Sequence, residues 1–165
     1  MKEPRWLSII DLNSDSETNS LLYPILPYGK MGSAAAAIGF PSCRYRDIVA
    51  YYYQVHIAED VRYRVIYPTG STAFSFGLDS GRPEALFFGT ATFPREVEFP
   101  IPGGDYLVTV FWPYTGYALF RIPSSEFANR SVPLEEMLPG DSESMRERLI
   151  LSKSFQERIH VIEKF

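Results

Sequence analysis

The segment RYRVIYPTGSTAFSFGL (62–78) decides the fold, because both of its halves alternate and a turn separates them. In the second half, Thr, Phe and Leu at even positions alternate with Ala, Ser and Gly at odd positions. A period of two residues is typical of a β-strand. Between the halves, Pro68 presets φ for a turn and Gly70 can take a positive φ. We therefore predict two strands, over 62–67 and 72–78, joined by a tight turn.

Further short runs rich in β-branched and aromatic residues lie on both sides of this segment, bounded by turn residues. They are IVAYYYQVHI (48–57), LFFGTATF (86–93), EVEFPI (96–101) and YLVTVFW (106–112). The turn sequences DSGR and PGGD separate some of them. Strands this short and this closely spaced favour a barrel or sandwich over βαβ units.

From Pro113 onward the pattern changes to short helical pieces, YALF, SSEFAN and PLEEML, followed by two longer helices. Asp141 is a candidate N-cap for the first of these, SESMRERLIL. In the second, SFQERIHVIEKF (154–165), Ser154 and Glu157 are spaced as a capping box. The sequence therefore predicts an α+β fold, in which a mainly antiparallel β-barrel is followed by a C-terminal group of short helices.

The length of 165 residues fits one domain with a hydrophobic core. Residues 1–40 alternate polar, Pro-rich and small-residue stretches without a period, so we assign them to a leader. Within the leader, AAAA (34–37) is a candidate for a short helix. Residues 41–165 form the folded domain, with linker helices over about 141–165.

Composition narrows the possible partners and the compartment. A net charge of −4 argues against direct wrapping of nucleic acid by this chain, since phosphate contacts need clustered Lys and Arg. The single cysteine, Cys43, cannot form an internal disulfide, which favours a reducing cytoplasm. No apolar run approaches the length of a membrane span. We expect a cytoplasmic protein with no membrane partner.

The sequence contains no pattern typical of a metal, cofactor or catalytic site. His56 and His160 stand far apart and outside any metal-ligand motif, so we interpret both as structural. Cys43 is interpreted as an ordinary free thiol. Glu96 and Glu98 share a strand face and resemble a carboxylate pair, but a solvated edge is the better interpretation. We predict no cofactor, no metal and no enzymatic activity.

Aromatic residues make up 15% of the chain, and their alternation predicts rings inside the barrel. Two interpretations stay open, because the rings of a small barrel either fill it as core or line a ligand cavity. The ligand implied is neutral, and apolar or amphiphilic. The predicted wall residues are Tyr53, Tyr67, Phe74, Phe76 and Trp112.

The order of several segments resembles the N-terminal domain of a subgroup of AraC-type transcriptional regulators. These are YYYQV, VIYPTGSTAFSF, FFGTATF, VTVFWPYTGYALFRIPSSEFANRSVPLEEML and SFQERIHVIEKF, which together extend from about residue 48 to 165. The chain departs from that pattern at Thr69, where the family usually has Asp, and at Val110 and Trp112, where basic residues are common. The resemblance implies a cupin-like barrel that senses a small-molecule effector.

The resemblance also implies partners. In such regulators the last helix leads to a helix-turn-helix domain that binds DNA, and this chain ends before any such domain. The helices after the barrel commonly form a homodimer, which assigns dimerisation to the apolar stripe Phe155, Ile159 and Ile162. The alternative is that this stripe closes the chain's own barrel.

Two other function classes stay open from the sequence. The first is a metal-free cupin-like enzyme, an isomerase or lyase, for which Arg62, Arg64 and Gln54 are the polar candidates. The second is a protein-interaction domain whose barrel is filled and binds no ligand.

Overall fold

The computed structural model describes residues 36–79, 81, 84–98 and 103–165, and its strands form two antiparallel sheets. The larger sheet has six strands in the order β1-β2-β7-β4-β5-β8, and the smaller consists of β3 and β6. The strands are β1 (Ala36–Gly39), β2 (Val49–Ile57), β3 (Tyr63–Ile66), β4 (Thr72–Gly77), β5 (Ala85–Phe88), β6 (Arg95–Glu98), β7 (Gly104–Phe111) and β8 (Ser131–Pro133).

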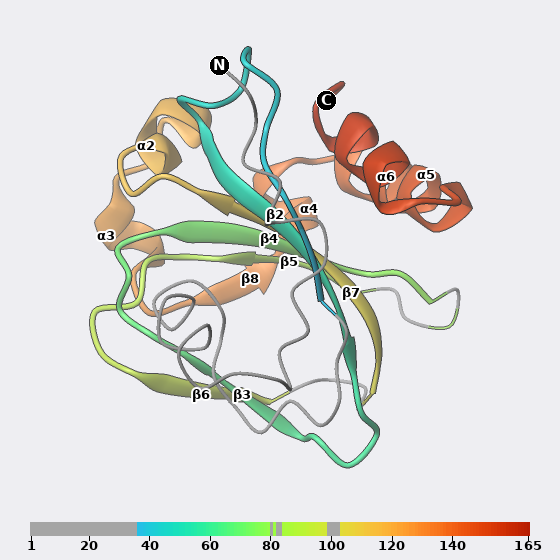
Figure 1. Cartoon of the computed structure of the whole chain (residues 1–165). Helices are drawn as coiled ribbons and strands as arrows, with labels where there is room; N and C mark the ends of the chain where they lie inside the picture. Colours follow the sequence, from blue (N-terminus) through green and yellow to red (C-terminus); the bar gives the residue numbers. More distant parts are fainter. Residues whose placement is uncertain (1–35, 80, 82–83, 99–102) are drawn as a thin grey trace, which may run out of the picture.

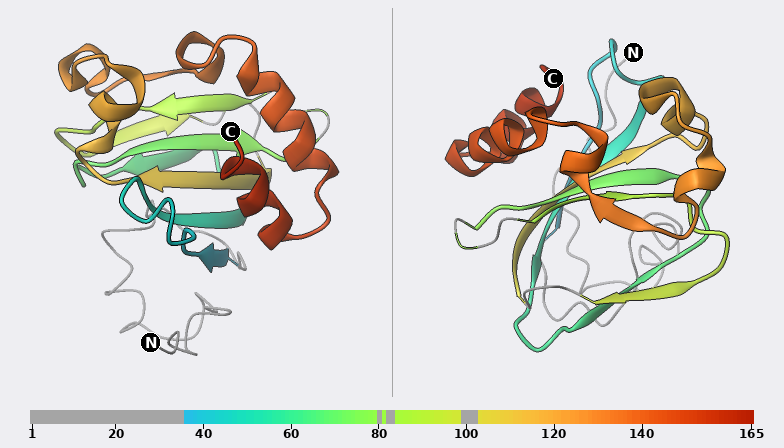
Figure 2. Two further views of the ribbon diagram at one scale, coloured as in Figure 1. Left: turned by 90° about the horizontal axis from the view of Figure 1, so that it is seen from above. Right: turned by 180° about the vertical axis from the view of Figure 1, so that it is seen from behind.

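Helices cover one face of the six-stranded sheet, and the β3–β6 pair faces the other (Figure 1). The two views of Figure 2 show this layering from above and from behind. The helices are α2 (Thr115–Phe120), α3 (Ser124–Phe127), α4 (Leu134–Met137), α5 (Asp141–Leu151) and α6 (Phe155–Ile162). We call the helix-covered side of the six-stranded sheet the outer face and the side toward β3 and β6 the inner face.

The predicted α+β class is confirmed: an antiparallel sheet is followed by a group of short helices. Closure into a barrel is not observed, since no ladder joins β3 or β6 to the six-stranded sheet within the described residues. Two sheets packed face to face remain compatible with a cupin-like jelly roll, which likewise divides its strands between two sheets.

The main core lies on the outer face, and its described members include five buried phenylalanines. Phe74 packs edge-on against Phe111, with ring centroids 4.7 Å apart, and Phe87 packs edge-on against Phe127 at 5.1 Å. Edge-to-face packing is a favourable arrangement of aromatic rings. Each such buried side chain stabilises the fold by about 1.5–3 kcal/mol. Helices α5 and α6 add Met145, Leu149 and Ile159 to the same core.

Two short edge strands differ from the prediction. Ala36–Gly39, partly within the candidate helix AAAA, forms β1 and pairs with β2, so the sheet begins before residue 41. Ser131–Pro133 forms β8 at the opposite edge, beside β5. Neither segment alternates over more than four residues, so the pairing with a longer neighbour decides its structure.

Helix α5 begins at Asp141, and the predicted side-chain cap by Asp141 is wrong. Gly140 occupies the N-cap position with φ at 80° and no side-chain cap. Instead, the Glu135 carboxylate of α4 accepts hydrogen bonds from the Gly140 backbone N–H, at 2.7 Å, and from the Ser142 hydroxyl. These bonds lower the pKa of Glu135, the Ser142 bond most strongly. The neighbouring helix therefore replaces the local cap.

Helix α6 begins as predicted, with Ser154 as its N-cap. The Ser154 hydroxyl accepts a hydrogen bond from the Glu157 backbone N–H at 3.2 Å. The Glu157 carboxylate in turn accepts from the Lys153 backbone N–H at 2.7 Å, one residue before the position expected in a capping box. The helix start is thus specified by its own sequence.

Candidate functional site

The candidate site is the inner face of the six-stranded sheet, and the predicted wall residues are divided between this face and the outer one. Tyr53 lies on the inner face in a cluster with residues of β7. Phe74 and Phe76 lie on the outer face, inside the helix-covered core. The structure therefore does not bring these three side chains together.

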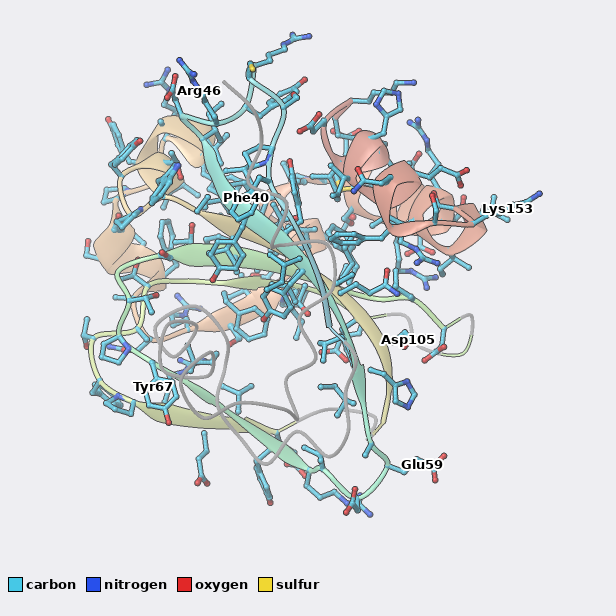
Figure 3. The ribbon with its side chains drawn as sticks, in the orientation of Figure 1. Phe40, Arg46, Glu59, Tyr67, Asp105 and Lys153 are labelled. Carbon is cyan, nitrogen blue, oxygen red and sulfur yellow. The ribbon has the colours of Figure 1, made fainter. Side chains whose placement is uncertain are left out.

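The other two predicted wall residues lie toward the ends of strands. Trp112 follows β7 with 41% of its surface exposed, and its Nε1–H donates to the Arg46 carbonyl at 2.9 Å. Tyr67 follows β3 and is partly buried. In Figure 3, Tyr67 lies at the end of the two sheets opposite to Asp105. Of the predicted set, Tyr53 and Tyr67 are thus the candidates for a ligand between the sheets.

Strand β2 lines the inner face with two tyrosines. Tyr51 and Tyr53 stack with ring centroids 6.2 Å apart and an interplanar angle of 26°. Burial raises the pKa of Tyr51, and the neighbouring Tyr53 raises it further. The Tyr51 phenol therefore stays neutral and keeps its hydrogen-bond donor at any physiological pH.

A buried glutamate lies at the other end of the inner face. Glu84 directly precedes β5 and keeps only 7% of its surface exposed. One of its carboxylate oxygens accepts a hydrogen bond from the Tyr106 hydroxyl at 3.3 Å. Glu84 was not among the predicted site residues, because it comes shortly after the DSGR turn as a single charge before an apolar strand. The fact that a charged residue directly precedes a buried strand is the only sequence signal for it.

The predicted dimerisation stripe faces the chain's own sheet. Ile159 keeps 6% of its surface exposed, and Phe155 and Ile162 pack against the same core. A Cβ atom at Gly39 of β1 would lie 2.6 Å from Ile159 Cδ1 and 3.0 Å from the Phe155 ring. A side chain at position 39 would therefore force Ile159 and Phe155 to shift. In this structure the stripe covers the β1 edge, as in the alternative interpretation from the sequence.

Polar contacts also join α6 to β2 and the segment before it. Arg158 donates to the Gln54 side-chain oxygen at 2.7 Å, and its other nitrogens donate to the backbone carbonyls of Leu149 and Ser152. Glu163 accepts from the Ser42 backbone N–H at 2.8 Å and, at 3.5 Å, from the Tyr52 hydroxyl. Burial, and then Glu163, raise the pKa of Tyr52.

The polar candidates for an enzyme do not gather on the inner face. Gln54 points toward α6 and bonds Arg158, and Arg62 is exposed. The Arg64 side chain lies outside the described part of the structure.

The remaining titratable candidates are on the surface. His56 is exposed, with its Nδ1 3.0 Å from an Asp105 carboxylate oxygen. His160, Cys43, Glu96 and Glu98 are also exposed. Nowhere in the described ranges do three or more His, Cys, Asp or Glu side chains gather in a way that could hold a metal ion.

Comparison with known protein families shows the family to which the chain belongs. The sequence profile of the family described as domain of unknown function DUF6597 matches residues 40–133, more than half of the chain. The match extends from the end of β1 to the end of β8, and so includes the inner face. No curated protein and no solved structure matches the chain significantly. Among the described helices, none has the length and apolar character needed to cross a bilayer.

Proposed function

We propose that this chain, which belongs to the DUF6597 family of domains of unknown function, is the ligand-sensing and dimerisation domain of an AraC-type bacterial transcription regulator. In this proposal a small-molecule effector binds on the inner face, and α6 relays binding to a DNA-binding domain. The resemblance of the ordered sequence segments supports the regulator class, and the geometry of β2 supports the relay.

The observation that carries the proposal is that β2 has one side on the candidate site and the other side on α6. Tyr51, Tyr53 and Val55 face the inner side of the sheet. Tyr52 and Gln54, which alternate with them, contact Glu163 and Arg158 near and in α6. A ligand that shifts β2 therefore acts directly on the residues that hold α6, because successive side chains of one strand move together.

The inner face supports a binding role rather than catalysis. Its described members are mainly apolar, with tyrosine hydroxyls that can orient a ligand. An apolar or amphiphilic effector suits this surface, and the proposal requires no metal or cofactor. The single, exposed Cys43 is compatible with a reducing cytoplasm, where a bacterial regulator would act.

The dimer of this proposal uses a different surface from the one predicted. Because the stripe around Ile159 packs on its own sheet, the exposed side of the α5–α6 pair is the proposed contact with a second copy. Leu151 and Phe165 are exposed there, at 78% and 50%. A symmetric dimer would place two DNA-binding domains over two half-sites.

A ligand screen followed by hydrogen exchange tests the proposal. Neutral and amphiphilic compounds that bind the folded chain raise its melting temperature by mass action. We expect the best compound to slow the exchange of the α6 amides as well. Tyr53→Leu should abolish the thermal shift, whereas Tyr63→Leu, at an exposed tyrosine of β3, should retain it. If no compound shifts the melting temperature, or if binding leaves α6 exchange unchanged, the proposal is refuted.

A further inference from the structure

Strand β4 presents its three smallest side chains to the inner face. Register places Ala73, Ser75 and Gly77 there, opposite Val110, Val108 and Tyr106 of β7. On the other side of β4, Phe88 and Leu86 of β5 lie opposite Ala73 and Ser75. We call Ala73, Ser75 and Gly77 the β4 strip. Its side chains extend less far from the sheet than those of both neighbouring strands.

Ser75 adds an independent sign of a ligand. Its side chain is 0% exposed, and its hydroxyl has no hydrogen-bond partner within the described part of the chain. Its cross-strand neighbours, Val108 and Leu86, carry no polar side-chain group. A buried hydroxyl without a partner costs about 1–3 kcal/mol, which a partner on a ligand would offset.

The two other buried hydroxyls that lack a partner in the described ranges are on the outer face. Thr72 lies opposite Phe111, and Thr109 lies opposite Phe74, both members of the helix-covered core. Ser75 is therefore distinguished by its position on the inner face, beside the tyrosines of the candidate site.

Burial along the strip indicates how a ligand is oriented. Ala73, and Tyr51 two strands away on the far side of Val110, are partly exposed, whereas Ser75, Gly77 and Tyr106 are buried. The Ala73 end is thus the more accessible one, and the Gly77 end lies next to the Tyr106–Glu84 hydrogen bond. The mainly apolar side chains around the strip disfavour a charged group of either sign on the ligand, because a charge taken out of water without a partner is costly. From Ala73 to Gly77 the strip extends roughly 13 Å, at about 3.3 Å per residue.

We infer that the β4 strip binds a slender, neutral amphiphile whose single hydroxyl or carbonyl group bonds the Ser75 hydroxyl. The apolar body of the ligand extends from Ser75 toward and past Ala73, the more accessible end of the strip, between the side chains of β7 and β5. This inference rests on the proposed function, because it names the ligand class and the position for the effector of the same inner face.

Binding of 1-decanol, compared with decanoate and decylammonium, tests the ligand class. We expect 1-decanol to raise the melting temperature and to bind at least tenfold more tightly than either charged analogue. Ser75→Ala should weaken 1-decanol binding roughly three- to tenfold, which is the value of one neutral hydrogen bond. The melting temperature of the free protein should stay the same or rise, since the hydroxyl it loses has no partner.

Two further variants test whether the ligand binds on the inner face of the sheet and whether it needs the space above the β4 strip. Thr109→Val removes a buried hydroxyl from the outer face of the sheet and should leave 1-decanol affinity unchanged. Ala73→Leu fills the accessible end of the strip and should abolish binding, and the partial exposure of Ala73 makes this substitution tolerable. Tighter binding of decanoate, or unchanged affinity in Ser75→Ala, would overturn the inference.

The outcome also separates this inference from the proposed function. If a compound from the screen binds and slows α6 exchange but 1-decanol does not bind, the ligand class is wrong and the sensing function stands. If 1-decanol binds through Ser75 but α6 exchange does not change, the strip is a binding site and the relay is refuted.

Discussion

Replacing Ile159 with alanine should destabilise the folded chain by about 3 kcal/mol, within the usual 2–5 kcal/mol for a buried Ile→Ala change. Ile159 is 6% exposed and belongs to the main core. We expect a value in the lower half of the range, because its partner β1 is an edge strand and can relax toward the space left. For a chain of this size the melting temperature should fall by roughly 6–12 °C.

Urea denaturation at protein concentrations from micromolar to near-millimolar measures the loss in the free energy of unfolding. It also shows whether Ile159 packs in the core of its own chain or in an interface between two chains. Because Ile159 packs on its own chain, the loss should be the same at every concentration. Leu151→Ala is the matched control on the adjacent helix, where the side chain is 78% exposed. At the lowest protein concentration, where the proposed dimer through Leu151 does not form, it should change stability by less than about 0.5 kcal/mol. An Ile159→Ala loss no larger than that of the control, or one that appears only where the protein is dimeric, would refute the packing described.

A double-mutant cycle with Gly39 checks the contact itself. A Cβ atom at residue 39 would lie 2.6 Å from Ile159 Cδ1, so Gly39→Ala should destabilise the wild-type background. Ile159→Val removes the Cδ1 atom, and Gly39→Ala should then cost less by about 1 kcal/mol. Additive effects would show that α6 does not rest on β1 as described.

Three further predictions concern separate parts of the fold. Gly89→Ala places a Cβ atom 1.8 Å from the Phe127 carbonyl oxygen, part of a backbone that cannot rotate away, and should cost about 3 kcal/mol in urea denaturation. Arg158→Met removes three hydrogen bonds that hold α6 and should cost about 2 kcal/mol, with faster exchange of α6 amides and unchanged exchange in β4. The pKa of Glu135 is lowered from 4.5, so its contribution to stability is present at neutral pH and is lost as the pH falls through its folded pKa. In Glu135→Gln the melting temperature should therefore fall less steeply than in the wild type as the pH drops below about 4.5. The same pH dependence in both proteins would contradict this prediction.

The strands and the last helix were predictable because their signals are local. The alternation in 72–78 became β4, and the Ser154 hydroxyl caps α6 as its spacing with Glu157 indicates. Asp141 has the same kind of signal but does not cap α5, since Glu135 of the preceding helix bonds the groups at that end. The local signal fails here because a side chain from another helix bonds the groups at the start of α5 in place of the predicted cap.

The division of the aromatic residues between two faces was not predictable from alternation. Alternation fixes which residues of one strand share a face. Only the register between two strands decides whether their aromatic residues lie on the same face of the sheet. Tyr53 is aligned with Val108, and Val108 with Ser75, so Phe74 and Phe76 must face the opposite side. A bulge between Val49 and Tyr51 also moves residues of equal parity in β2 to opposite faces.

The strength of the contacts that hold α6 decides whether effector binding releases this helix from the sheet or holds it more tightly. If Ile159 contributes about 3 kcal/mol and Arg158 about 2 kcal/mol, undocking α6 costs on the order of 5 kcal/mol. To release α6, an effector would have to bind the undocked state about ten-thousand-fold more tightly than the docked one. An effector that binds the docked state only tenfold more tightly already lowers the population of the undocked state tenfold at saturation. Ligand binding on the inner face should therefore tighten α6 on β1 and β2, and slower rather than faster exchange of its amides is the expected result.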